Sequence, residues 1–81
     1  MTAQQTEELV RQAIRQVFRL EEVPEDASPE TVAEWDSLNH INLMLELEGT
    51  LGISIPAQEY AELVSYRAIL EAVRARRGAD Q

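Results

Sequence analysis

The sequence of 81 residues contains no cysteine. This absence excludes disulfide bonds and metal sites built on thiolates. No apolar run approaches the ~18 residues that a membrane-spanning helix requires, and the polar residues 1–5 do not resemble a signal peptide. We therefore expect a cytoplasmic protein that does not enter a membrane.

Basic residues are also scarce. The 7 that are present are all arginine, and 15 acidic residues bring the formal net charge to −8. No basic residue lies between Arg19 and Arg67, although most of the acids do. This balance disfavours a nucleic-acid partner, because phosphates are bound by Lys and Arg. Two interpretations stay open: a surface that steers basic partners, and an ordinary solvated surface, which charge alone favours.

The length allows one small domain, residues 1–81, with an ordered core of about residues 3–77. Hydrophobic periodicity predicts an all-α bundle of three main helices and one short helix, at about residues 3–20, 37–51, 57–63 and from 66 onward. Thr2 and Gln5 have the spacing of a capping box, Gly52 is expected to end the second helix, and Ser65 to cap the last. Three arginines lie near the negative end of that last helix: Arg74, Arg76 and Arg77.

A long loop over residues 21–36 separates the first two helices. It contains acids and no base, and Ser28-Pro29 is suited to start one helical turn. Val23, Val32 and Trp35 are expected to anchor the loop in the core. Loops of this length in small domains are often functional.

Two apolar stripes run along the helix expected at residues 37–51. Packing against one core needs only one stripe, so the second is either buried on another side or meets a partner protein. Periodicity leaves these interpretations even, although polar residues border the second stripe as they border an interface. The first stripe is Leu43, Leu47 and Leu51 with Met44 at its edge, the second is Leu38, Ile41 and Leu45, and the polar border is Asn39, Asn42, Glu46 and Glu48.

Asp36-Ser37 marks the start of this helix. It is either an ordinary cap or the site of a modified serine, because free N–H groups and the helix dipole favour a phosphate there. In the second case Asp36 also helps to hold a metal ion brought by the modifying enzyme. Leu38 is expected to point away from the core.

His40 lies one turn after Ser37, which raises the possibility of a nucleophilic pair. We reject catalysis as the leading idea, because the chain has no Gly-x-Ser-x-Gly elbow and no third group to orient the imidazole. His40 is expected to be a packed histidine at the end of the bundle. The acids lack the spacing of a calcium-binding loop, and a lone histidine disfavours a transition-metal site.

Residues 34–41 (Glu-Trp-Asp-Ser-Leu-Asn-His-Ile) and 51–56 (Leu-Gly-Ile-Ser-Ile-Pro) resemble an acyl carrier protein, and the resemblance covers nearly the whole chain. It implies an acyl-carrier-like four-helix bundle with a long first loop. It also implies 4′-phosphopantetheine attached covalently to Ser37 by a separate transferase, with acyl or aminoacyl groups carried on its thiol as thioesters. The protein would then be a carrier and not itself an enzyme.

The resemblance further implies that the helix after Ser37 docks onto partner enzymes. Those partners are the phosphopantetheinyl transferase and the acyl-loading, condensing or modifying enzymes of one pathway, and the carrier is expected to be a monomer. The recognition residues that it implies are Asp36, Leu38, Asn39, Ile41, Asn42, Leu45 and Glu48.

The sequence also departs from the pattern of fatty-acid carriers. Asn39, Asn42 and Gly49 stand where those carriers tend to have acids, and Trp35 resembles discrete carriers of specialised pathways such as polyketide or mixed peptide assembly. The sequence does not name the cargo. The alternative function is an unmodified helical interaction module that uses the same helix.

Overall fold

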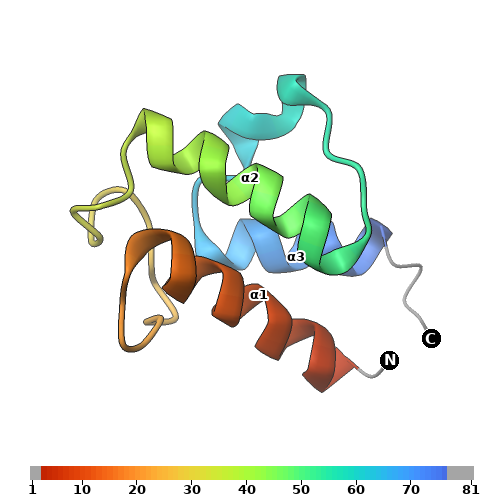
Figure 1. Ribbon diagram of the computed structural model, residues 1–81, viewed down its shortest axis with the longest axis horizontal. Coiled ribbons are helices and arrows are strands. Elements are labelled where there is room, and N and C mark those ends of the chain that lie inside the picture. The colour runs from red at the N-terminus through yellow and green to blue at the C-terminus, as the bar shows by residue number, and fades with distance from the viewer. Residues whose placement is uncertain (1–2, 77–81) are drawn as a thin grey trace.

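The computed structural model describes residues 3–76, and within that range the chain is all-helical with no strand. The elements are α1 (Ala3–Phe18), α2 (Ser37–Leu51), the 3-10 helix η1 (Ala57–Glu62) and α3 (Tyr66–Arg76). α1 and α2 run in opposite directions, α1 packs against both α2 and α3, and η1 packs against α2 (Figure 1). The prediction of an all-α protein with three main helices and one short helix is confirmed.

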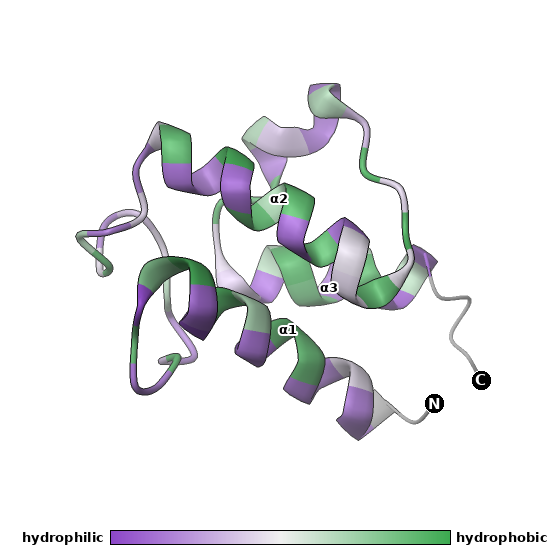
Figure 2. Cartoon of the chain, in the orientation of Figure 1, coloured by the Kyte–Doolittle hydropathy of each residue, from purple (hydrophilic) through white to green (hydrophobic). Residues whose placement is uncertain are grey.

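The core forms where the apolar stripes of the three α-helices meet. Figure 2 shows hydrophobic and hydrophilic residues alternating along the helices, as amphipathic helices require. Full burial of one large apolar side chain contributes roughly 1.5–3 kcal/mol. The most deeply buried large side chains are Val10, Ile14 and Phe18 of α1, Leu43, Met44 and Leu47 of α2, and Ile69 and Val73 of α3.

α1 ends at Phe18, two residues earlier than expected from its apolar pattern. Arg19 adopts a left-handed conformation with φ 58°. The N–H of Leu20 then donates to the carbonyl of Arg15 at 3.0 Å, which is the long bond of a Schellman motif. Arginine is an unusual residue in this left-handed position, so nothing in the sequence indicated that α1 ends at Phe18.

The loop between α1 and α2 is held against the helices by apolar side chains that it buries in the core. The predicted anchors Val23, Val32 and Trp35 are all buried, and Ala27, which sequence reasoning did not identify, is buried as well. The carbonyl of Ala27 accepts a bond from the N–H of Tyr66 at 2.9 Å, so the loop is attached to the start of α3. The loop is therefore a fixed part of the structure.

Caps define the other helix boundaries. Gly52 ends α2 in a left-handed conformation with φ 66°, as predicted, and donates to the carbonyl of Glu48 at 2.9 Å. The hydroxyl of Ser65 accepts from the N–H of Ala68 at 3.0 Å and so caps α3, also as predicted. Ser28 starts a single turn, in which its carbonyl accepts from the N–H of Val32 at 2.8 Å.

η1, the short helix expected over residues 57–63, is a 3-10 helix over Ala57–Glu62. Arg76 at the end of α3 ties this region down by pairing with Glu59 of η1 and donating to the carbonyl of Ser54 at 3.0 Å. The expected capping box at Thr2, the role of Arg77 and the tail at residues 78–81 lie outside the described residues. No helix within residues 3–76 is both long enough and apolar enough to cross a membrane.

Candidate modification and docking site at the start of α2

Asp36 caps the N-terminus of α2. Its backbone is extended (φ −100°, ψ −178°), and its carboxylate accepts from the N–H of Asn39 at 2.8 Å. The carbonyl of Asp36 accepts the first helical hydrogen bond from His40 at 2.8 Å. This is the geometry of a standard Asp cap, and it places Ser37 as the first helical residue.

Ser37 is exposed, and its hydroxyl forms no hydrogen bond to any residue within 3–76. The cap is supplied by Asp36, so the Ser37 oxygen is not needed for that purpose. The unpaired N–H groups of the first turn and the positive end of the helix dipole favour an anion next to this oxygen. A phosphate ester on Ser37 therefore fits the local electrostatics.

An open cavity of about 330 Å³ lies beside Ser37. This volume is at the lower end of the range for small-molecule sites. The wall is shared by the long loop, the first turn of α2 and the link between η1 and α3. It consists of Pro29, Trp35, Asp36, Ser37, His40 and Val64.

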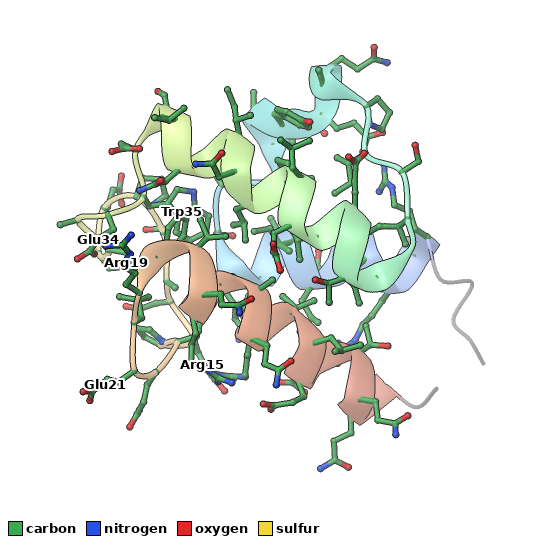
Figure 3. The ribbon with its side chains drawn as sticks, viewed as in Figure 1. Arg15, Arg19, Glu21, Glu34 and Trp35 are labelled. Atoms are coloured by element: carbon green, nitrogen blue, oxygen red, sulfur yellow. The ribbon has the colours of Figure 1, made fainter. Side chains whose placement is uncertain are left out.

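Trp35 lies between the end of α1 and the first turns of α2, while Glu34 lies on the outer side of the loop (Figure 3). The Trp35 ring packs on Phe18 with 4.9 Å between ring centroids, and its side chain is almost fully buried. Trp35 is thus the core anchor that the sequence predicted. It fixes the segment that leads into Ser37.

His40 is half-buried and has both ring nitrogens engaged. Nδ1 accepts from the Trp35 indole at 2.9 Å, and Nε2 lies 2.8 Å from the carbonyl oxygen of Tyr60. An indole N–H can only donate, so Nδ1 is the acceptor. Nε2 therefore carries the ring proton and donates a hydrogen bond to the carbonyl oxygen of Tyr60. His40 is therefore the packed histidine that was expected, and neither of its nitrogens is free to act as a base for Ser37.

The second apolar stripe of α2 is exposed to solvent. Leu38, Ile41 and Leu45 have exposed fractions of 69%, 45% and 55%, whereas the opposite stripe lies in the core. Periodicity alone left open whether the second stripe is buried on another side of α2 or is exposed for a partner. Burial on another side is wrong. We call Leu38, Ile41 and Leu45 the exposed face of α2. Together with Val64 they are the exposed large hydrophobic residues of the described chain.

The polar residues implied in recognition are partly occupied within the molecule. Asn39 donates from its side chain to the carbonyl of Glu34 at 2.9 Å, and Asn42 makes only a long contact of 3.4 Å to Asn39. Glu48 accepts from the N–H of Ile55 at 2.7 Å. Glu48 thus holds the segment after α2 in place, a role that the sequence did not reveal.

Among residues 3–76 no group of three or more His, Cys, Asp or Glu side chains is arranged to hold a metal ion. Comparison of the chain with protein-family models and with curated proteins gave no match.

Proposed function

We propose that this protein is an acyl carrier that bears 4′-phosphopantetheine on Ser37. It presents acyl-type intermediates, held as thioesters, to partner enzymes of polyketide or related specialised biosynthesis. The observation that carries the proposal is the exposed hydroxyl of Ser37, which has no partner within residues 3–76 and begins a helix already capped by Asp36. The exposed face of α2 lies on the same helix and supports docking of those enzymes.

The residues around Ser37 fit the prosthetic group. The helix N-terminus favours its phosphate, the cavity beside Ser37 offers room along the start of the arm, and the group would supply the thiol that a chain without cysteine lacks. In the attachment step the Ser37 oxygen forms a bond to phosphorus of the coenzyme A pyrophosphate. Adenosine 3′,5′-bisphosphate leaves, and the hydroxyl proton passes to a base of the transferase.

A carrier needs no catalytic residues of its own, and the geometry of His40 agrees with that role. Both of its nitrogens are engaged by Trp35 and Tyr60. The arrangement supports a structural histidine next to an acceptor serine, and it argues against a minimal hydrolase built on Ser37 and His40. Absence of turnover on activated esters would agree with this.

The test is modification in vitro. Incubation with coenzyme A and a broad-specificity phosphopantetheinyl transferase should add one 4′-phosphopantetheine to the intact protein, as measured by mass spectrometry. Ser37→Ala should abolish the gain. Ser54→Ala is the matched control, because Ser54 is also exposed and only its backbone carbonyl takes part in a contact. No gain in the wild type, or a gain that survives Ser37→Ala, would refute the proposal.

The alternative is an unmodified helical interaction module, which the exposed face of α2 supports without reference to Ser37. It predicts that Ser37→Ala retains function in the host while Ile41→Asp or Leu45→Asp destroys it. The carrier predicts loss in all three variants. Circular dichroism of Ser37→Ala shows whether the fold is retained.

A further inference from the structure

The first nine residues of α2, from Ser37 to Leu45, contain no acidic or basic residue other than His40. Its Nδ1 accepts a hydrogen bond from Trp35, and an imidazole that accepts is uncharged. The exposed face of α2 is therefore surrounded by serine and asparagine over this whole stretch.

The carboxylates near the two ends of α2 each accept one hydrogen bond within the molecule. Asp36 caps the helix by accepting from Asn39, and Glu48 accepts from the N–H of Ile55. Glu46 accepts from the Thr50 hydroxyl at 3.1 Å. Asp36 lies before the uncharged stretch and Glu46 and Glu48 follow it, so a partner that contacts residues 37–45 meets no carboxylate there.

The negative charge of this region lies instead on the loop before the helix. The acids of that loop are exposed, and none of them forms an ion pair with another residue of the described chain; they are Glu21, Glu22, Glu25, Asp26, Glu30 and Glu34. Charge and apolar surface are thus separated along the chain. A partner that contacts α2 meets apolar groups and amides there.

We infer that the exposed face of α2 binds an enzyme surface that is apolar and bears uncharged hydrogen-bond donors in place of Lys or Arg. Leu38, Ile41 and Leu45 supply the apolar contact. Asn42, whose side chain makes only the long contact to Asn39, supplies a carbonyl oxygen that accepts from the partner. The inference rests on the proposed function, because the enzymes concerned are those that reach Ser37.

The inference is tested by whether one isosteric substitution lowers or raises kcat/KM for modification of Ser37. Asn42→Asp puts a carboxylate at the border of the face, where an apolar partner would have to desolvate it without a counter-charge. With the broad-specificity transferase as the probe, kcat/KM for modification of Ser37 should fall by about tenfold. A cationic partner surface would produce the opposite result, because the new charge would speed encounter at low salt.

Gln16→Glu is the matched control. It adds the same charge by the same isosteric change at an exposed position of α1, and it should leave kcat/KM unchanged. Rates are compared at about 0.1 M and about 1 M NaCl, where the screening length falls from roughly 10 Å to roughly 3 Å. Salt should not restore the Asn42→Asp rate, because desolvation and not long-range repulsion causes the loss.

Each other outcome contradicts the inference in its own way. A raised rate for Asn42→Asp would assign a cationic partner surface, and a loss that high salt restores would assign an anionic one. An unchanged rate would remove Asn42 from the docking surface. A doubled mass in light scattering that Ile41→Asp returns to the monomer value would assign the face to a second copy of this chain. No modification of the wild type under any condition would instead refute the proposed function.

Discussion

The indole N–H of Trp35 donates to Nδ1 of His40 at 2.9 Å, and the two ring planes are inclined at 29° with 6.1 Å between their centroids. On its other side the imidazole contacts the Tyr60 carbonyl and lies edge-on to the Tyr60 ring. One side chain of α2 thus connects the long loop to η1. The connection forms one wall of the cavity beside Ser37.

His40→Phe should destabilise the protein, because it leaves the buried indole N–H of Trp35 without its acceptor. The Tyr60 carbonyl loses its bond to His40 but keeps the one from the N–H of Leu63. One unsatisfied buried group costs about 1–3 kcal/mol, so we expect a loss of about that size in the free energy of unfolding. His40→Gln retains a donor and an acceptor and should lose less. Urea unfolding followed by the fluorescence of the single tryptophan measures both. Equal losses in the two variants would show that the hydrogen bonds contribute nothing.

Arg19 and Gly52 end α1 and α2 in the same left-handed region, at φ 58° and φ 66°. A side chain in that region costs roughly 1–2 kcal/mol, from which glycine is exempt. Arg19→Gly should therefore raise the free energy of unfolding by about 1 kcal/mol, and Gly52→Ala should lower it by a similar amount. No atom lies within 4 Å of the Cβ that Gly52→Ala would add, so the loss would reflect backbone strain alone. Thermal or urea unfolding of the two variants decides the matter, and a shift of the same sign in both would contradict it.

The sequence predicted the features that local chemistry determines. The start of α2 at Ser37, its end before Gly52, and the buried stripe through Leu43 and Leu47 follow from helical periodicity and cap residues, and the structure confirms them. The sequence indicates Asp36-Ser37 together as the cap of α2, and in the structure the capping side chain is that of Asp36.

Features that depend on distant partners were missed. The Tyr60 carbonyl lies twenty residues from His40 along the chain, and the packing of η1 against α2 brings the two together. The bond from the N–H of Ile55 to Glu48 depends on how the chain turns after Gly52. Burial of the second stripe was undecidable from sequence, because periodicity reports that a face is apolar and not whether the fold covers it.

Tyr66 makes the stability depend on pH in the alkaline range. Burial, and then the hydrogen bond that the phenol donates to Glu7 at 3.0 Å, raise the pKa of Tyr66 above its ordinary value. The folded state thus holds this proton more tightly than the unfolded state. The stabilisation is fully present below about pH 10, where the unfolded tyrosine titrates, and is lost as pH rises from there toward the folded pKa.

Tyr66→Phe should therefore flatten the fall in unfolding free energy above about pH 10. The chain has no lysine or cysteine and only two tyrosines, so few other side chains titrate in this range. Tyr60→Phe is the matched control, because it removes the other tyrosine hydroxyl and leaves the bond between Tyr66 and Glu7 in place. Urea unfolding at a series of pH values checks this. A Tyr66→Phe slope as steep as that of the wild type would contradict the assignment.

Leu45 and Leu47 are two positions apart on α2 and should respond oppositely to substitution. Leu47 is fully buried, so Leu47→Ala should cost about 2–5 kcal/mol of unfolding free energy. Leu45 is exposed, so even Leu45→Asp should leave the melting temperature nearly unchanged while it slows modification of Ser37 by the transferase. The separation of stability from docking distinguishes a binding surface from an incidental apolar patch. A large drop in melting temperature for Leu45→Asp would place Leu45 in the core, and a normal rate of modification would remove it from the docking surface.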